Sequence, residues 1–374
     1  MENASKTPPQ IEIDADDVAA LLYTSGTTGN PKGVVLTHKN LYTNAKAAAD
    51  TASILKLKQG RVALGVLPFS HAFGFTMMNV TLILGDKNVL LPQFEPKKVL
   101  EAIEKYKVTH TAMVPAMFHA LLHHPDADKY DTSSFFAATS GSAPLSEKLA
   151  RDFQRKFSCI ILEGYGLSEA APIVTATDPT KKIKPGSVGT PLPGIEIAVV
   201  DEDGNRLPPN EVGELIVRGP NVLKEYYNKP NETKNVLKDG WLYTGDMARI
   251  DEDGYLFIVD RKKDLIIRGG FNIYPRDLEE LLMSHPDVIE AGVVGIPSPK
   301  MGEEVVAYVV KRKDSNVTEE ELIEYCQENL AKYKTPRYIK IVGFLPKNLI
   351  GKIDKKKLRE QAKKDFGELV ENVQ

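Results

Sequence analysis

The stretch from Tyr23 to Gly33 constrains this chain more than any other, because it consists mainly of hydroxyl-bearing residues and glycine and carries one lysine. Apolar runs stand on both sides of it, at 18–22 and 34–36. The pattern predicts a strand, a thin loop and a second strand, since glycine and small hydroxyl residues leave backbone N–H groups accessible. Backbone amides, hydroxyl groups and the Lys32 ammonium can together hold phosphate oxygens. A polar hairpin loop without a ligand is the plainer alternative, but the density of donors favours phosphate binding.

The spacing excludes the Walker A phosphate loop, which has the pattern G-x-x-x-x-G-K-[ST] at the start of a helix. Gly26 and Gly29 are three residues apart, and Pro31 precedes Lys32. Gly33 stands where that pattern needs serine or threonine. A phosphate-binding loop of another class is therefore expected.

The composition is that of a globular protein with more than one domain. The 374 residues exceed one typical domain, and 42% of them are hydrophobic. The net charge of −3 argues against a nucleic-acid partner bound through bulk charge. Cys159 and Cys326 stand far apart, so we expect no disulfide, no metal cluster and a cytoplasmic location. The sequence has no signal peptide and no apolar run of membrane-spanning length.

Strand and helix signals alternate along the chain, which predicts an α/β architecture. Thr37 is the expected N-cap of a helix that runs to about Ala52. Residues 1–17 are expected to form a polar linker, and the polar residues from Lys363 onward are expected to fray. We expect further helices at 97–106, 277–283 and 318–329, and strands at 61–67, 108–114, 135–139, 159–162, 255–259, 265–267, 288–294, 305–310 and 338–342.

Several later segments carry residues that could serve a nucleotide site, although each has a plainer reading when taken alone. His71, among aromatic residues, is more often a packed or capping residue than a catalyst. The loop at 140–145 could simply start a helix, although its small residues would let a flat ring approach the backbone. Glu169 could be a solvated carboxylate, yet a Mg²⁺ that bridges nucleotide phosphates needs only one or two such groups.

Three further segments also allow both a structural and a functional interpretation. Asp246 could belong to a turn, or it could accept both hydroxyl groups of a ribose. The charged run at 260–264 could be a solvated loop between two strands. Lys347 and Lys352, near the end of the chain, could be surface charges.

Taken together and in this order, these motifs resemble the adenylate-forming superfamily, which includes acyl-CoA synthetases, peptide-synthetase adenylation domains and luciferases. The resemblance implies a multi-domain α/β fold. An AMP-binding domain of mixed β-sheets and helices would occupy 1–260, and a small mobile α+β domain would occupy 261–374. Full members carry a further upstream segment, so the large domain is expected to be incomplete. A homo-oligomer, or a separate chain supplying that segment, is therefore expected as a partner.

The resemblance also implies residue roles. Tyr165 would face adenine, Arg261 would lie near the ribose, and Lys263 would be the pivot between the domains. Ile350 departs from the threonine that many members carry before the glycine, which leaves the role of the following lysine intact. The implied catalytic residues are Lys352, Glu169, Thr24 and His71, of which Thr24 and Glu169 would hold Mg²⁺ and His71 would border the acyl pocket. The implied nucleotide-binding residues are Thr24, Ser25, Gly26, Thr27, Thr28, Gly29, Lys32, Gly141, Ser142, Ala143, Glu163, Gly164, Tyr165, Gly166, Ser168, Asp246, Arg261, Lys263, Gly269 and Gly270.

The activity implied is ATP-dependent formation of an acyl-adenylate, followed by transfer of the acyl group to CoA with release of AMP. The sequence motif at 270–275 resembles that of fatty-acyl synthetases more than that of aryl synthetases, so a fatty acid is the expected substrate. Two alternatives stay open: a nucleotide-binding or partner-binding module without turnover, and an enzyme that loads a carrier protein. The second is weakened because no carrier domain follows Gln374.

Overall fold

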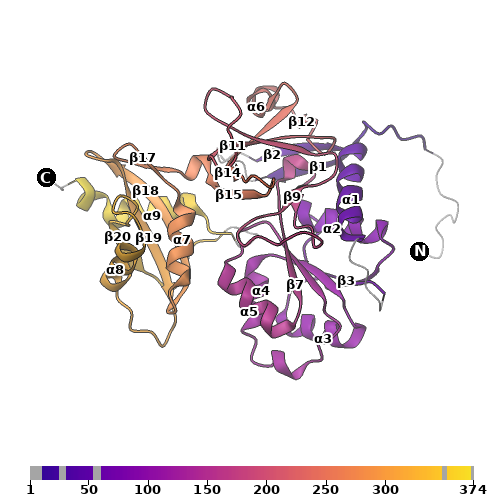
Figure 1. Ribbon diagram of the computed structural model, residues 1–374, viewed down its shortest axis with the longest axis horizontal. Coiled ribbons are helices and arrows are strands. Elements are labelled where there is room, and N and C mark those ends of the chain that lie inside the picture. The colour runs from indigo at the N-terminus through magenta and orange to yellow at the C-terminus, as the bar shows by residue number, and fades with distance from the viewer. Residues whose placement is uncertain (1–10, 25–30, 54–59, 348–351, 372–374) are drawn as a thin grey trace.

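The computed structural model describes residues 11–24, 31–53, 60–347 and 352–371. Figure 1 shows a larger lobe, coloured indigo to salmon, and a smaller lobe in orange and yellow. Over the described residues the framework consists of four β-sheets, one of which belongs to the smaller lobe. The predicted α/β class and the presence of a small C-terminal domain are confirmed.

The largest sheet has seven strands, and helices connect its parallel part. Its first five strands run parallel and the last two run antiparallel. In spatial order the strands are β4 (Lys87–Leu90), β3 (Val62–Gly65), β5 (His110–Met113), β6 (Ala137–Ser140), β7 (Ile160–Gly166), β8 (Ile173–Ala176) and β9 (Thr190–Pro191). The accompanying helices are α2 (Ala72–Ile83), α3 (Pro96–Tyr106), α4 (Pro115–Leu122) and α5 (Glu147–Phe157), with a short 3₁₀ turn η1 (Ala127–Lys129). Buried Val99, Met113 and Phe153 belong to the core beneath these helices.

The strand β7 is longer than predicted. The sequence indicated a strand that ends at Leu162, because glycines follow it, whereas β7 continues to Gly166. Pairing with β8 holds the extra residues in register, with Gly164 opposite Ala176 and Tyr165 opposite Thr175. Partner strands thus override the low strand propensity of glycine here.

The predicted strand–loop–strand at the start of the chain is confirmed at its two ends. The strands β1 (Val18–Thr24) and β2 (Lys32–Thr37) pair antiparallel, with Thr24 opposite Lys32, and β12 (Glu225–Tyr226) pairs with β2. The predicted helix follows as α1 (His38–Ser53). Thr37 caps it as expected: its hydroxyl accepts from the backbone N–H of Asn40 at 3.2 Å.

An antiparallel five-stranded sheet completes the larger lobe. Its strands, in spatial order, are β10 (Glu196–Val200), β11 (Gly213–Arg218), β14 (Trp241–Ile250) and β13 (Leu237–Lys238), with β15 (Leu256–Arg261) also paired to β14. The elements beside it are α6 (Pro230–Val236) and the 3₁₀ turn η2 (Ser168–Ala170). After β15 the chain makes the turn η3 (Lys262–Asp264) and then enters the sheet of the small domain at Ile266. The domain boundary at 260/261 stays a prediction.

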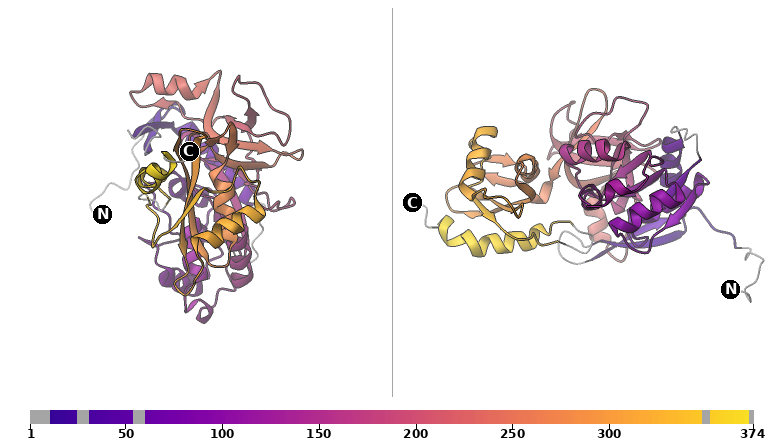
Figure 2. Two further views of the ribbon diagram at one scale, coloured as in Figure 1. Left: turned by 90° about the vertical axis from the view of Figure 1, so that its left-hand side faces the viewer. Right: turned by 90° about the horizontal axis from the view of Figure 1, so that it is seen from below.

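The small domain is a five-stranded sheet with helices on both faces. Its strands are β17 (Phe271–Ile273), β16 (Ile266–Arg268), β19 (Gly302–Lys311), β18 (Val288–Ser298) and β20 (Tyr338–Ile341). The helices α7 (Pro275–Ser284) and α8 (Glu319–Asn329) share one core with Val293 and Val305, whereas α9 (Lys355–Glu371) packs with Val294 and Val306. Because adjacent strand residues point to opposite faces, the two cores lie on opposite sides of the sheet. Figure 2 shows α9 as a yellow helix along one side of this domain.

The expectation that the chain frays from Lys363 onward was wrong for the part that the structure describes. Those residues belong to α9, in which Leu358, Ala362 and Val370 are at most 3% exposed. Phe366 follows the same spacing of four residues and stacks on Tyr338 at 4.9 Å. This spacing places one apolar stripe on an otherwise charged helix, and the charged composition hid it.

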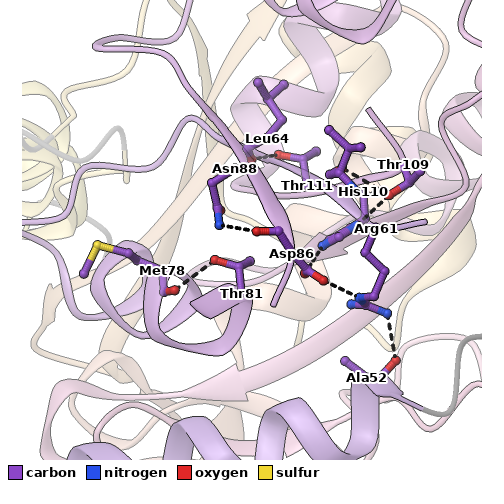
Figure 3. Close-up of polar contacts among 11 residues, drawn as sticks. Ala52, Arg61, Leu64, Met78, Thr81, Asp86, Asn88, Thr109, His110 and Thr111 are labelled. Carbon is purple, nitrogen blue, oxygen red and sulfur yellow. Dashed lines mark hydrogen bonds and ion pairs between the residues drawn. The ribbon is translucent and has the colours of Figure 1, made fainter. Parts of the chain in front are cut away.

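A buried ion-pair network holds together the starts of three strands in the seven-stranded sheet (Figure 3). The Asp86 side chain is 0% exposed and contacts Arg61 Nε at 2.7 Å and His110 Nε2 at 3.1 Å. Burial alone would raise the pKa of Asp86, but the hydrogen bonds from His110 and Arg61 outweigh it and lower that pKa. Arg61 Nη1 also donates to Ala52 O at 3.4 Å, which links the end of α1 to the sheet.

Two further expectations concern the whole chain. Cys159 and Cys326 are both free thiols and both are buried. Within the described ranges, every helix is too short or too polar to traverse a bilayer.

Candidate active site

A buried aspartate joins the seven-stranded sheet to the five-stranded sheet. Asp246, in β14, is 3% exposed. Its carboxylate accepts a hydrogen bond from the Tyr165 hydroxyl of β7 at 2.5 Å and pairs with Arg261 Nε at 3.0 Å. Burial and the Asp246 charge raise the pKa of Tyr165, so the phenol keeps its proton. The structure therefore brings together three of the residues implied in nucleotide binding, from three different strands.

Lys352, from the small domain, lies beside this trio. Burial and, to a smaller extent, the positive charge of Arg261 lower the pKa of Lys352 to about 8, although the Asp246 charge opposes the shift. An amine with this pKa is mostly protonated at neutral pH and so carries its positive charge there. An anion placed between Lys352 and Arg261 would interact with both positive charges.

His71 caps a helix and also lies near Lys352. Its Nδ1 accepts from the backbone N–H of Phe73 at 3.3 Å, at the start of α2. The capping role that the sequence left open is therefore confirmed. Burial lowers the pKa of His71, and so does the Lys352 charge, which keeps the imidazole neutral.

A mainly apolar cavity adjoins the same helix. Its lining includes Gly74, Met77 and Met78 of α2 and Leu67 and Phe69, which precede the helix, together with the polar residues Thr81, Asn88, His110 and Thr111. Methionine side chains adapt to ligands of different shape. The role of His71 at the border of an acyl pocket stays a prediction.

Glu169 lies at the phosphate-loop end of the site. Its Oε1 accepts from the Tyr226 hydroxyl at 2.8 Å, and Lys32 Nζ lies 5.0 Å from the centroid of the Tyr226 ring. Thr24 pairs with Lys32 across β1 and β2. The negative charge of Glu169 also contributes to the raised pKa of Arg261, although Asp246 contributes more. The Tyr226 side chain thus contacts both Lys32, in the hairpin of β1 and β2, and Glu169.

The middle of the phosphate loop, Ser25, Gly26, Thr27, Thr28 and Gly29, lies outside the described residues. Within the described ranges, no three histidine, cysteine, aspartate or glutamate side chains gather as a metal cage. One carboxylate, Glu169, beside the Thr24 end of the hairpin suits Mg²⁺, which takes most of its remaining ligands from nucleotide phosphates and water. The residues present therefore fit a Mg²⁺ that arrives with its nucleotide.

The two glycine-rich segments of the predicted adenine site lie side by side, because β6 and β7 pair with Ser140 opposite Glu163. A Cβ on Gly141 would stand 3.2 Å from the Phe73 ring and 3.8 Å from Gly164 O. A Cβ on Gly166 would stand 2.1 Å from Pro172 O, so the backbone itself requires glycine there. The roles of Ser142, Ala143 and Ser168 in binding adenine or phosphate stay predictions.

Four further implied residues lie in β7, in η3 and in the turn between β16 and β17. Burial raises the pKa of Glu163 to about 7, and Arg276 of α7 opposes that shift, so this carboxyl lies near the small domain. Gly269 and Gly270 form the turn between β16 and β17, where Gly269 N donates to Met301 O at 2.7 Å. Lys263 is exposed in η3. Their nucleotide-binding roles stay predictions.

Tyr226 and Arg276 were not predicted from the sequence. Tyr226 occurs in the run 223–229, where no spacing or motif distinguishes it. Arg276 follows Pro275 at the start of a helix and reads as an ordinary surface cation. Only the approach of distant elements gives these two side chains their partners.

Comparisons with known proteins find similar sequences along most of the chain. The profile of the AMP-binding enzyme family matches residues 1–227, and the profile of the AMP-binding enzyme C-terminal domain matches residues 277–352. A long-chain-fatty-acid–CoA ligase of Bacillus subtilis (strain 168) is 44% identical over 95% of this chain and 63% of its own length. The 4-coumarate–CoA ligase 2 of Nicotiana tabacum is 40% identical over 94% of this chain and 66% of its own length. The chain thus spans a little less than two thirds of these relatives.

Solved structures extend the likeness to three dimensions. The ATP-bound crystal structure of MatB from Rhodopseudomonas palustris superposes with a TM-score of 0.91 at 38% identity, covering 98% of this chain and 72% of that chain. The apo structure of MatB, at the same identity and coverage, gives a TM-score of 0.78. The arrangement of this chain is therefore nearer to the ATP-bound form of that protein.

Proposed function

The chain belongs to the AMP-binding enzyme family, and we propose that it activates a fatty acid in two steps at the site around Asp246. In the first step a carboxylate oxygen attacks the α-phosphate of ATP, the bond to the β-phosphate breaks, and acyl-adenylate and pyrophosphate form. In the second step the thiol of CoA attacks the acyl carbon and AMP leaves, which gives the thioester. Positioning and charge stabilisation supply most of the catalysis in such phosphoryl chemistry.

The position of Lys352 is the observation that carries this proposal. A lysine from the small domain lies beside Asp246, Arg261 and Tyr165 of the large domain, in an arrangement close to that of an ATP-bound relative. In the first step Asp246 would accept from the ribose hydroxyls and Tyr165 would stack on adenine. The Lys352 ammonium would stabilise the charge that develops at the α-phosphate.

Glu169 and Thr24 would hold the Mg²⁺, and the Tyr226 hydroxyl orients the Glu169 carboxylate by its hydrogen bond. When bound, Mg²⁺ neutralises phosphate charge and orients the leaving pyrophosphate. Lys32, above the Tyr226 ring, is placed to contact the same phosphates. Neutral His71, whose pKa the nearby Lys352 charge helps to lower, would border the reacting carboxylate without adding a charge of its own.

Two facts support a fatty acid as the substrate. A fatty-acid ligase is the relative with 44% identity, and the cavity beside α2 is mainly apolar with two methionines. The 4-coumarate ligase relative, at 40% identity, makes an aryl acid the second candidate. We also propose a cytoplasmic location, since both cysteines are buried free thiols of the kind that a reducing compartment maintains.

ATP–pyrophosphate exchange tests the proposal. The purified chain is incubated with labelled pyrophosphate, ATP, Mg²⁺ and one acid at a time, namely fatty acids of increasing length and 4-coumarate. We expect exchange with fatty acids and thioester formation once CoA is added. Exchange with 4-coumarate but with none of the fatty acids would indicate an aryl acid as the substrate. Nucleotide binding without exchange for any acid would contradict it and favour a binding module.

A further inference from the structure

Asp260, the residue before Arg261, connects the large domain to a helix of the small domain. Its carboxylate lies near the end of β15 and the residue is 7% exposed. One oxygen accepts from the backbone N–H of Arg261 at 2.7 Å, and the other accepts from the backbone N–H of Arg276 at 2.8 Å. Arg276 is the second residue of α7, whose own N-cap residue, Tyr274, makes no side-chain capping bond. A carboxylate from another sheet therefore caps this helix, where the helix dipole favours negative charge.

The side chain of Arg276 adds a second link at the same place. Its Nη1 donates to the carbonyl of Ile258 in β15 at 2.6 Å, and its Nε donates to Glu280 at 2.7 Å. The start of α7 is thus bound to β15 through both the backbone and the side chain of one residue. These contacts cross from the core of the small domain, to which α7 belongs, to the sheet that carries Asp246.

From α7 the contacts continue to Lys352. Glu279, three residues after Arg276, pairs with Lys355 Nζ at 3.0 Å and accepts from the backbone N–H of Val293 at 2.8 Å. Lys355 begins α9, only three residues after Lys352. The Asp260 charge also raises the pKa of Lys355, although burial opposes it and Glu279 contributes more. Polar contacts at both ends of one turn of α7 therefore connect β15 to the segment that carries Lys352.

We propose that Asp260 is a positioning residue for Lys352: by capping α7 it fixes the small domain in the orientation that places this lysine beside Asp246. The catalytic consequence of this positioning rests on the proposed function, whereas the contacts that position Lys352 do not depend on it. Since α7 turns with the small domain, any rotation of that domain must break the Asp260–Arg276 bond. The two MatB structures share one sequence and superpose differently on this chain, so a relative of this fold takes more than one arrangement.

Accessibility of Lys352 tests the positioning without using catalysis. The full chain, free of substrates, is treated with an amine-reactive acetylating reagent, and modification of Lys352 is followed by mass spectrometry. In the native protein Lys352 is partly buried and should react slowly. Asp260→Ala should accelerate its modification by about 5- to 150-fold, the usual range of coupling between linked sites.

Asp251→Ala is the matched control. Asp251 lies at the opposite end of the β14–β15 hairpin, and it too accepts backbone hydrogen bonds, from Asp253 at 3.0 Å and Tyr255 at 2.9 Å. Its loss should leave the modification rate of Lys352 unchanged. If Asp260→Ala fails to fold, Asp260→Ser serves instead, because a shorter side chain with a single oxygen cannot accept from both backbone N–H groups. An unchanged Lys352 rate in the folded variant would overturn the proposal.

Kinetics then separate a positioning role from a purely structural one. With the fatty acid found active, Asp260→Ala should lower ATP–pyrophosphate exchange while CoA-dependent consumption of pre-made acyl-adenylate is kept, and Asp260→Asn should recover part of the exchange. Equal loss of both steps would refute the positioning role. If the native chain catalyses no exchange, the labelling experiment still tests whether Asp260 positions Lys352. Failure of the proposed function can therefore be distinguished from failure of this proposal.

Discussion

Two buried aspartates in this molecule have nearly the same partners and different consequences. Asp246 binds Arg261 at 3.0 Å and Tyr165 at 2.5 Å, whereas Asp86 binds Arg61 at 2.7 Å and His110 at 3.1 Å. The difference lies in what surrounds each arginine. The Arg261 side chain is 49% exposed, whereas that of Arg61 is 20% exposed.

The side chains of the Asp86 network bind one another and nearby groups of the same fold. Arg61 also donates to the carbonyl of Ala52, and His110 Nδ1 contacts the Thr109 hydroxyl at 3.0 Å, so its polar groups are used within the fold. The Asp246 trio instead borders Lys352, whose pKa of about 8 reflects burial and the nearby Arg261. Similar ion pairs can therefore stabilise a fold or form a binding site. Solvent access and the further charges that lie near the pair decide which.

The sharpest test of this comparison removes each aspartate in turn. Asp86→Ala should lower the free energy of unfolding by about 3–5 kcal/mol, because it leaves Arg61 without its buried counter-charge. Asp246→Ala should cost less stability, since Arg261 can reach solvent, but it should weaken binding of ATP. Chemical denaturation and nucleotide titration measure the two effects. Equal destabilisation with equal nucleotide affinity would erase the distinction.

Removing the lysine beside the open cluster should impair the first step. Lys352→Ala should depress ATP–pyrophosphate exchange by about 10²-fold or more, the scale of losing one preorganised charge in a reaction site. Consumption of pre-made acyl-adenylate with CoA should persist. Lys347→Ala is the control, because Lys347 pairs with Glu290 at 2.5 Å within the small domain. A similar loss of both steps would show that Lys352 is not specific to adenylation.

The pH dependence should also distinguish the two clusters. Because burial lowers the pKa of Lys352 to about 8, the protonated amine disappears as the pH rises through that value. Exchange measured as kcat/KM for ATP should then fall by about tenfold per pH unit above it, as expected for one essential proton. Lys352→Arg should abolish this fall, since guanidinium stays charged. A native profile that is flat up to pH 10 would mean that Lys352 does not act as a cation.

The smallest effect is expected for the metal ligand. Glu169→Gln keeps an acceptor for the Tyr226 hydroxyl, so the unfolding midpoint should change little, but the Mg²⁺ concentration needed for half-maximal exchange should rise several-fold. Titration of Mg²⁺ at fixed ATP measures it. Tyr226→Phe, which keeps the carboxylate, should shift the requirement less. An unchanged Mg²⁺ requirement in Glu169→Gln would assign this residue a structural role.

Local patterns were enough to predict much of the fold. The apolar runs around Tyr23–Gly33 predicted β1 and β2, and Thr37 predicted the start of α1, because pairing and capping depend on neighbours in sequence. Strand ends were less predictable. The continuation of β7 to Gly166 depends on β8, and α9 depends on a stripe that becomes meaningful only against the sheet.

The sequence by itself determined which residues could serve a nucleotide and the order in which they occur. Tertiary structure alone decided which of them meet: Tyr165 and Asp246 are 81 residues apart in the chain, and Lys352 reaches them from another domain. It also gave partners to residues that no motif distinguishes, such as Tyr226 beside Glu169 and Asp260 at the start of α7. The physical reason is that charge and hydrogen-bond energies depend on distance and burial, which a linear sequence does not contain.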